Sequence, residues 1–499
     1  MHKSSLALLA FTSLLLVAQG CSKKKGPTAE ELGIEPPRTR VEISAARLED
    51  KIRGGLLAEL LGNLDGLPHE FKYFGEPGSV EDFTPGLPEG ARTDDDTDIE
   101  WVYVSEMQKS GELFLAPERI TELWKAHVNG GIWCANAYAR QLMDLGLDPP
   151  LTGMIALNPW SVFNISGQFV CESFGLIAPG MPQTAGMLGT YYTHVTIDGE
   201  PSQAAQLFTT MIATAFIEDS LESILEAGLQ ALDPRSAHFR LVSQVRDWYH
   251  QNPGDWRATR KLIMDNYAVY GNHDGRETRD GNGYELNTAS TVAALLYGAG
   301  DLKETLRRAF NFGWDADCNA ATAASIVGVI RGRSWIESQG WKIEDRYRNT
   351  SRPGMPEDET ISSYGDRLVE LAQKIILAQG GEEFYAASTK EKTYRIKLQQ
   401  PANVEPLPEP LDRLESLREQ LVPLFDLWLG GSAEERARAA YLAICLGEAG
   451  SLAKDKPAEW KKAQAELKKH TELIKLIFEA PANAGEQIKE RATATGLKK

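Results

Sequence analysis

The sequence predicts an all-α protein, and three features of its residue pattern support that prediction. Apolar residues recur every four positions after Ser44, as on one face of a helix, at Leu48, Ile52, Leu56 and Leu60. Runs that alternate between apolar and polar residues, which are typical of strands, are scarce. Alanine and glycine are dense over residues 289–299 and 320–332, where small side chains allow helices to approach closely.

Further helices follow in order along the chain. Helical spacing predicts them at residues 113–127, 135–145, 182–193, 203–217, 221–232, 239–251, 256–267, 288–298, 302–310 and 320–332. We therefore expect a helical domain over residues 41–385. The proline-rich sequence QQPANVEPLPEP ends a linker that we place at residues 386–410.

A helical C-terminal region is expected over residues 411–499. Its helices are predicted at residues 411–430, 432–448 and 457–478. Ser432 and Glu435 have the spacing of a capping box at the start of the middle helix.

Composition excludes several classes of protein. The chain has 499 residues, of which 42% are apolar, and a formal net charge of −17. This length predicts a large core with at least one appendage. Because no basic surface can dominate at this charge, we expect no nucleic-acid partner. The 5 cysteines show no CxxC spacing, which argues against a zinc ribbon or a disulfide-rich scaffold.

The N-terminus has the pattern of a signal segment. Residues 1–20 have a short basic start at His2 and Lys3 and continue with an apolar run that is too short to span a bilayer. Cys21 directly follows small residues and resembles a bacterial lipoprotein cleavage box, which implies lipidation of Cys21. We then expect residues 21–40 to be a tether, with the protein on the periplasmic side of the cell envelope and in contact with the membrane only through its lipid. An ordinary signal peptide is the alternative.

The first acidic cluster lies at residues 92–100, which read RTDDDTDIE. Asp94, Asp95 and Asp96 repel one another unless water, protons or a cation neutralises them. An apolar segment follows directly, so we expect these residues to form the first turn of a buried helix, where the helix dipole favours anions. The alternative is a helix cap with more acidic residues than it needs.

The second acidic cluster is Asp315 and Asp317, after a glycine turn and directly before a small-residue helix. Buried carboxylates at this position are penalised unless they are paired. Their hard oxygen atoms suit Mg²⁺, Mn²⁺ or Ca²⁺ rather than zinc. Two such clusters in one helical chain predict a shared cation site.

Together these residues resemble the ADP-ribosylglycohydrolase family. That family has a glycine-rich start ending in glutamate, a T-D-D-T block and a late G-G-D-T-D-T block. Residues 62–70 read GNLDGLPHE, with Asn63 in place of the family's aspartate. The middle block matches either residues 94–97 or residues 93–95, and the register stays open. The late block is GWDADC, with Cys318 where threonine is usual.

The resemblance covers about residues 45–375 and implies an orthogonal helical bundle of the ADP-ribosylglycohydrolase type. It also implies two divalent ions at the base of a cleft, usually Mg²⁺, with Mn²⁺ as the alternative, which would bind ribose hydroxyls and polarise water. The implied metal ligands are Asp94, Asp95, Asp96, Asp315, Asp317 and Cys318. Since a thiol is a soft ligand, Cys318 is a poor partner for Mg²⁺.

The implied activity is metal-dependent hydrolysis of a glycosidic bond in an ADP-ribosyl or other ribose-containing substrate. Because glycoside cleavage passes through an oxocarbenium-like state, we expect carboxylates beside the anomeric carbon. Glu70 is the expected general acid/base, with Asp95 as a second catalytic carboxylate. A salt-bridged loop position is the alternative for Glu70. The alternative function is a metal-stabilised binding protein that lost turnover, which Asn63 and Cys318 would permit.

Substrate contacts are expected from Gln168, His194 and His273. The family places substrate loops near the first of these residues, relatives often have histidine near the cleft at the position of His194, and His273 lies on a glycine-rich loop. A core or capping role is the alternative for His194. Cys134 and Cys171 could pair in an oxidising compartment.

Overall fold

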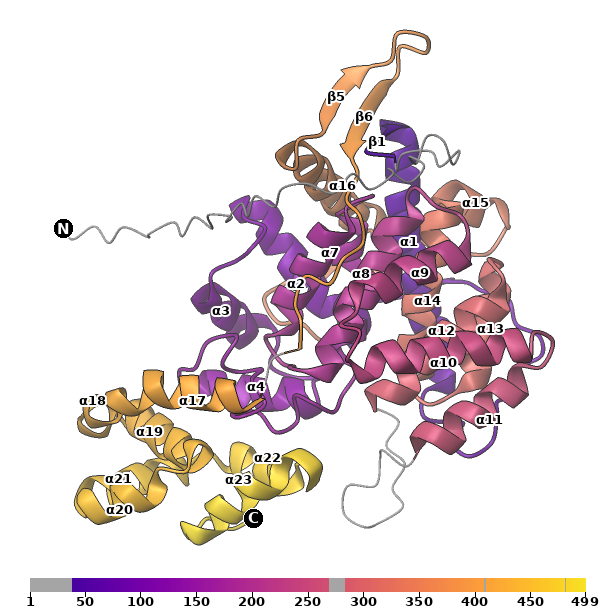
Figure 1. The fold of residues 1–499 in the computed structure, drawn as a ribbon. Coiled ribbons are helices and arrows are strands. Elements are labelled where there is room, and N and C mark those ends of the chain that lie inside the picture. The colour runs from indigo at the N-terminus through magenta and orange to yellow at the C-terminus, as the bar shows by residue number, and fades with distance from the viewer. Residues whose placement is uncertain (1–37, 269–282, 408–409, 481) are drawn as a thin grey trace, which may run out of the picture. The chain divides into compact units, whose positions relative to one another are not determined.

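A computed structural model describes residues 38–268, 283–407, 410–480 and 482–499. Residues 40–499 form one compact unit (Figure 1). Its first helices are α1 (Ala45–Gly66), α2 (Asp95–Ser110), α3 (Pro117–His127), α4 (Cys134–Asp144), α5 (Ser166–Phe169), α6 (Glu172–Leu176), α7 (Pro182–Thr193), α8 (Gln203–Ala215), α9 (Leu221–Ala231), α10 (Ala237–Gln251) and α11 (Trp256–Tyr267). The next are α12 (Tyr284–Gly298), α13 (Leu302–Phe312), α14 (Ala316–Arg331), α15 (Arg333–Ser338) and α16 (Ile361–Ala378).

The C-terminal helices have a core of their own. They are α17 (Pro410–Leu421), α18 (Phe425–Gly430), α19 (Ala433–Leu446), α20 (Ala449–Asp455), α21 (Pro457–Leu467), α22 (Thr471–Glu479) and α23 (Ala482–Ala494). Apolar side chains of α4 belong to the same cluster, and the hydroxyls of Tyr138 and Tyr441 lie 2.8 Å apart. Trp160 also donates to the carbonyl of Leu476 at 3.1 Å. The C-terminal region therefore packs on the preceding domain.

The all-α prediction is confirmed, since the described chain is mostly helical. Ser44 caps α1 by accepting a hydrogen bond from the Arg47 amide, and Ser432 forms a capping box with Glu435. Some boundaries differ from the prediction: α12 begins at Tyr284 instead of residue 288, and the helix expected over residues 411–430 is divided into α17 and α18. Within the described ranges, no helix has both the length and the apolar character needed to cross a bilayer.

Two small sheets were not expected from the sequence. One has the order β1-β6-β5 and the other β2-β3-β4. The strands are β1 (Arg40–Ser44), β2 (Ala91–Arg92), β3 (Tyr347–Arg348), β4 (Asp358–Glu359), β5 (Glu382–Tyr385) and β6 (Lys392–Lys397). β6 lies inside the expected linker and pairs antiparallel with β1, so that Val41 faces Ile396. This part of the expected linker is therefore ordered by pairing with the start of the chain.

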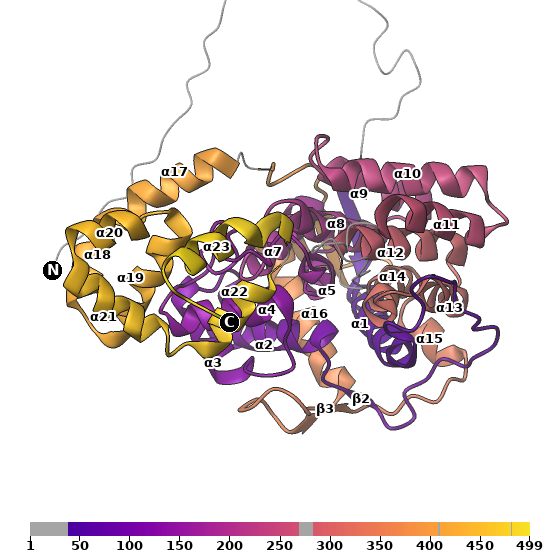
Figure 2. The ribbon, with the colours of Figure 1, turned by 90° about the horizontal axis from the view of Figure 1, so that it is seen from below.

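The packing of α1 against α14 positions the two acidic clusters. These helices lie side by side near the centre of the unit (Figures 1 and 2). Glycines of α1 allow near-backbone contact: a Cβ atom on Gly62 would lie 2.5 Å from the Ala320 carbonyl oxygen, and one on Gly66 would lie 2.5 Å from the Asp317 Cα. The close approach therefore places the end of α1 directly beside the first turn of α14.

Replacement of Gly62 by alanine is expected to destabilise the protein by about 1–3 kcal/mol or more, because the obstructing atoms belong to backbone and cannot move aside. Urea unfolding monitored by circular dichroism measures the change. Gly450→Ala in α20 is the matched control, since no atom lies within 4 Å of its added Cβ. Equal stability of Gly62→Ala and the wild type would contradict the close packing of α1 and α14.

Candidate metal centre

The first acidic cluster forms the start of α2. Asp94 is the N-cap residue, and its carbonyl accepts the first hydrogen bonds of the helix from the amides of Thr97 and Asp98. The short β2–β3 pairing holds the preceding residues, and the amide of Thr350 donates to the Thr93 hydroxyl at 2.7 Å. The cluster therefore lies where the helix dipole favours negative charge, as the sequence predicted.

The second cluster forms the start of α14 in the same way. Asp315 is the N-cap residue and Asp317 lies in the first turn. A buried amide network supports this turn: the Asp315 amide donates to the Asn287 side-chain oxygen at 3.2 Å, and Asn319 donates to the same oxygen at 2.9 Å. Two helix N-termini thus present carboxylates from segments that are far apart in the sequence.

The structure brings these two starts together. Ligand atoms of Asp96, Asp317 and Cys318 all lie within 4.8 Å of one another, and all three residues are buried. Glu70, Asp315 and Asp317 form a second such group, in which Glu70 is exposed. Asp317 belongs to both groups. The arrangement is therefore one acidic centre with two potential cation positions and one side open to solvent.

Asn63 on α1 connects the first cluster to this centre. Its side-chain amide donates to Asp94 at 3.0 Å and also to Asp96. Arg92 approaches the other oxygen of Asp94 at 3.4 Å. Since an aspartate at position 63 would add another carboxylate, the amide lowers the repulsion within the centre and uses its two hydrogens to orient two acids.

Burial and mutual repulsion change the acidity of the centre. The pKa values of Asp95, Asp96 and Asp317 are raised well above the usual range, first by burial and then by neighbouring carboxylates. The same causes raise the pKa of Glu70 to about 7, whereas burial raises that of Asp315 to about 6 despite hydrogen bonds that lower it. Burial and mutual repulsion therefore favour the protonated forms of these groups when no cation is bound.

Three buried glutamates adjoin the centre. They are Glu59 on α1, Glu100 on α2 and Glu172 on α6, and neither oxygen of Glu59 has a hydrogen-bond partner in the described part of the chain. The backbone amide of Ser173 donates to Glu100, and the Thr322 hydroxyl donates to Glu172. Burial raises the pKa of Glu59 and Glu100 well above the usual range and that of Glu172 to about 7.

The raised pKa values predict how stability depends on pH in the absence of metal. An acid whose pKa is higher in the folded than in the unfolded state makes unfolding easier as pH rises between those two values. The metal-free protein is therefore expected to melt about 5 °C or more lower at pH 8 than at pH 5. Added Mg²⁺ or Mn²⁺ is expected to stabilise it most at the higher pH, because cations bind deprotonated carboxylates.

Calorimetry in EDTA and in excess Mn²⁺ at several pH values tests this prediction. A metal-free melting temperature that rises from pH 5 to pH 8 would show that the buried carboxyls are neutralised in another way.

The residues of the centre fit hard divalent cations. Asp96, Asp315 and Asp317 each have a buried carboxylate oxygen without a hydrogen-bond partner among the described residues, and so does the Asn63 carboxamide. Oxygen atoms of this kind suit Mg²⁺ and Mn²⁺. Cys318 is the exception, since burial and nearby carboxylates raise the pKa of its thiol well above the usual range and favour the protonated form.

The part of the chain that carries both acidic clusters matches a protein-family model. The model for ADP-ribosylglycohydrolase matches residues 44–380. The chain belongs to the ADP-ribosylglycohydrolase family. A search of curated proteins gave no significant match. The match covers the helices that carry both acidic clusters and ends before the C-terminal helices.

Two of the metal ligands that the family resemblance implies, Asp94 and Asp95, lie outside the two groups of potential ligands. Asp94 is instead held by Asn63 and Arg92. Asp95 remains close enough to Asp94 and Asp315 for their charges to raise its pKa. The structure thus places both residues beside the centre, while Asp96, Asp315, Asp317 and Cys318 form it together with Glu70.

Two of the expected substrate-binding residues, Gln168 and His194, lie in the described part of the chain. Gln168 is fully buried and donates to Thr291 at 3.0 Å and to Asn319 at 3.1 Å. Through Asn319 it supports the start of α14. His194 pairs with Glu405 at 2.8 Å and faces an apolar pocket that contains no residue of the acidic centre. Neither residue belongs to the two groups of potential ligands, and a substrate role for either one stays a prediction. The burial of α5 and the Glu405 contact both depend on segments distant in the chain.

Three further expectations concern cysteines and a loop. Cys134 and Cys171 are not joined by a disulfide in the structure, so the pairing that an oxidising compartment would allow is not formed there. His273 and Cys21 lie outside the described residues.

Sequence reasoning missed a buried ion pair that supports α2. Arg352 and Asp98 lie 2.7 Å apart, with side-chain exposures of 1% and 0%. Ser351 donates to the same aspartate, and Arg352 also donates to the Gly130 carbonyl at 2.6 Å. The pair therefore connects α2 with a glycine loop that precedes the exposed Trp133. No spacing pattern in the sequence indicates such a contact.

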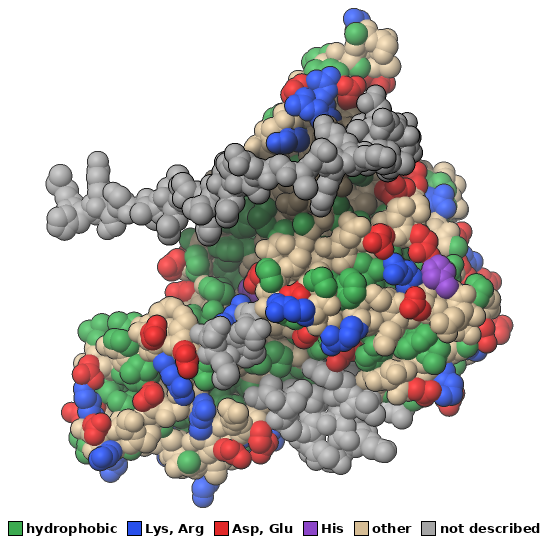
Figure 3. Space-filling view, viewed as in Figure 1, with side chains coloured by type: hydrophobic (Ala, Val, Ile, Leu, Met, Phe, Trp, Pro, Cys, Tyr) green, Lys and Arg blue, Asp and Glu red, His purple; other side chains and the backbone are tan. Residues whose placement is uncertain are grey.

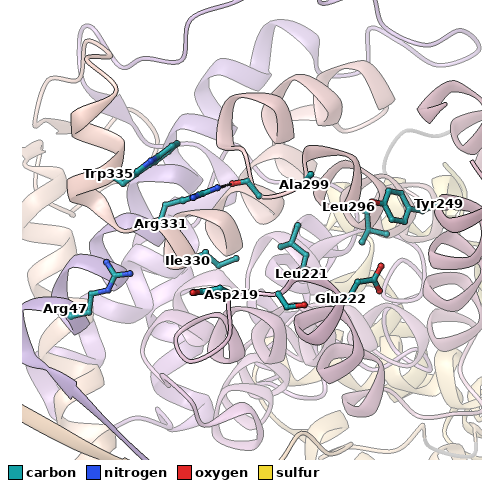
Figure 4. Close-up of a pocket in the computed structure, with 12 residues that line it drawn as sticks. Arg47, Asp219, Leu221, Glu222, Tyr249, Leu296, Ala299, Ile330, Arg331 and Trp335 are labelled. Atoms are coloured by element: carbon teal, nitrogen blue, oxygen red, sulfur yellow. Dashed lines mark hydrogen bonds between the residues drawn. The ribbon is translucent and has the colours of Figure 1, made fainter. Parts of the chain in front are cut away.

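A cavity of about 590 Å³ lies at the opposite ends of α1 and α14 (Figure 4). Arg47, Arg331 and Trp335 line one side of it, and Glu222 and Tyr249 lie toward the other. It is roughly 20 Å along α14 from the acidic residues. Its arginines already have partners, since Arg331 donates to the Gly300 carbonyl and Arg47 pairs with Asp50. This cavity shares no lining residue with the acidic centre.

Proposed function

We propose that the protein is a divalent-metal-dependent hydrolase that cleaves a ribosyl glycosidic bond in an ADP-ribosyl or other ribose-containing substrate. The observation that carries the proposal is the convergence of the starts of α2 and α14 on one buried acidic centre with Glu70 at its open side. Family membership supports the same reaction class.

The centre would hold two cations, usually Mg²⁺, with Mn²⁺ as the alternative. One would be held by Asp96 and Asp317, with Cys318 beside it as a poor ligand, and the other by Glu70, Asp315 and Asp317. When bound, divalent cations supply Lewis acidity and lower the pKa of coordinated water. They would also offset the negative charge of a diphosphate, which explains how an acidic site can accept an anionic substrate.

Glu70 is suited to move a proton during the reaction. Its pKa of about 7 means that both protonation states are populated near neutral pH, as a general acid/base requires. Its exposure allows contact with substrate. Asp95, which lies next in the chain to both Asp94 and Asp96, would add negative charge beside an oxocarbenium-like transition state.

The proposed location is the periplasmic side of a bacterial envelope, with a lipid on Cys21. This proposal rests on the basic start, the short apolar run and the small residues before Cys21. Cell fractionation tests it: Cys21→Ser should move the protein from the membrane to the soluble fraction. Wild-type protein in the soluble fraction would contradict it.

A binding protein without turnover is the second candidate. Asn63 and Cys318 favour it, because each replaces a residue usual in the family and each lies within the centre. Weakened cation binding would then leave ligand recognition intact without catalysis.

One experiment separates the two candidates. The purified full chain is incubated with Mg²⁺ or Mn²⁺ and with ADP-ribosyl-arginine, ADP-ribosyl-serine and small ribosides, and release of the ribosyl group is measured by liquid chromatography. Turnover that is lost in EDTA and in Asp315→Asn supports the hydrolase. Ligand binding by calorimetry without turnover supports the binding protein.

A further inference from the structure

Arg260 lies outside the acidic centre. It contacts both of the loops that form the open side of that centre. Arg260 on α11 is 2% exposed. Its Nε donates to the Phe312 carbonyl at 2.8 Å, and its Nη2 donates to the Phe74 carbonyl at 3.0 Å. The guanidinium carbon lies 4.5 Å from the centre of the Trp314 ring. A single planar group thus bonds to the end of α13 and to the segment that follows Glu70.

These two segments are also joined directly. The Phe71 amide donates to the Trp314 carbonyl at 2.7 Å, and the Trp314 amide donates to the Tyr73 carbonyl at 3.2 Å. Gly313 has φ +81°, and a Cβ atom there would lie 2.3 Å from the Tyr73 carbonyl oxygen. Glu70 and Asp315 are the residues adjacent to these contacts, so the position of one carboxyl depends on the position of the other.

The guanidinium explains why the carbonyls can converge. Tyr73 and Gly75 also direct their carbonyl oxygens toward it, at 3.3 Å and 3.4 Å. Carbonyl dipoles that point at one place repel one another, and a buried cation is costly unless it is fully bonded. The donors of arginine lie in a fixed planar fork that can serve several acceptors, which a lysine ammonium cannot reproduce. The buried guanidinium therefore needs the carbonyls of both loops for its full set of hydrogen bonds.

We propose that Arg260 is a positioning residue that locks the Glu70 loop to the start of α14 and so assembles the cation position formed by Glu70, Asp315 and Asp317. Its effect on turnover rests on the proposed hydrolase function, whereas its effect on the two loops does not. Because Arg260 donates to backbone carbonyls of both loops, it acts through the backbone that carries these carboxylates.

Hydrogen exchange with mass spectrometry tests the lock in the metal-free full chain. In Arg260→Ala, peptides that cover residues 70–78 and residues 311–316 are expected to exchange faster together, by about tenfold or more, whereas α1 and α19 keep wild-type rates. Arg260→Lys is expected to give an intermediate result. Arg257→Ala is the matched control, because it removes an exposed arginine one turn away on α11.

Cation binding and turnover extend the test. Mn²⁺ affinity, measured by electron paramagnetic resonance of the free ion, is expected to fall about 10-fold to 100-fold in Arg260→Ala. With a substrate that the wild type hydrolyses, kcat is expected to fall about 100-fold with a much smaller change in KM, and added guanidinium ion should restore part of it.

Unchanged exchange in both segments, or a change in only one, would overturn the proposal. If Arg260→Ala does not fold, Arg260→Lys carries the same comparison. If the wild type hydrolyses no substrate in the panel, the proposed function fails while the exchange result still decides the role of Arg260.

Discussion

Glu70→Gln is expected to lower kcat by about 10²-fold to 10⁴-fold, the range that general acid/base catalysis contributes. Glutamine keeps the size of the side chain but cannot give or accept a proton at this position. Because partial burial and the charges of Asp315 and Asp94 raise the pKa of Glu70 to about 7, the wild-type rate should change with pH near neutrality. Steady-state kinetics over pH 5–9 should show that dependence in the wild type and its loss in the variant.

Glu76→Gln provides the control for this experiment. Glu76 is exposed and lies in the same segment as Glu70, six residues further along, but belongs to neither group of potential ligands. It should retain wild-type kinetics. Full activity of Glu70→Gln would remove Glu70 from the chemistry, and equal losses in both variants would point to a general effect on the segment.

Asp317→Asn is expected to abolish metal-dependent stabilisation and turnover together. Asp317 is the residue common to both groups of potential ligands, so its loss weakens both cation positions. In the wild type, cation at about 100 times its Kd should add about 2.7 kcal/mol to the free energy of unfolding. In the variant this increment should disappear.

The same variant should behave in the opposite way without metal. Burial and neighbouring acids raise the pKa of Asp317 well above its usual range, so the carboxyl destabilises the metal-free fold at neutral pH. Asp317→Asn is therefore expected to melt above the metal-free wild type at pH 7.5. Differential scanning calorimetry in EDTA and in Mn²⁺ measures both effects.

Asp65→Asn is the matched control for Asp317→Asn. Burial raises the pKa of Asp65 to about 6, and its carboxylate accepts a hydrogen bond from the Gly86 amide at 3.0 Å, but it lies in neither group of ligands. It should keep the full response to Mn²⁺. An undiminished response in Asp317→Asn would show that the cations bind elsewhere.

The sequence was sufficient for the helical fold and for most of the acidic centre. Apolar spacing identified α1, since a four-residue repeat leaves little choice of secondary structure. The adjacent Asp94, Asp95 and Asp96 signalled a charged site because like charges next to a buried segment require neutralisation. The structure adds that Gly62 and Gly66 lie on the face of α1 that approaches α14.

Other features of the site depend on contacts that leave no local pattern. Arg260 and Arg352 are single residues, and their partners lie far away in the chain. The Glu405 contact of His194 likewise joins distant segments and directs this histidine toward a separate pocket. Strand β6 was missed in the segment predicted as a linker, because it is stabilised by pairing with β1, which lies far away in the chain.

Charge density and periodicity are local properties, so they indicated which residues need neutralisation and which segments are helical. Long-range packing was needed to establish which carboxylates could share a cation position, that Asp94 is held by Asn63, and that a guanidinium on α11 joins the two loops beside Glu70 and Asp315. These outcomes depend on how closely α1 and α14 pack, and packing distance is set by long-range contacts that no short stretch of sequence encodes.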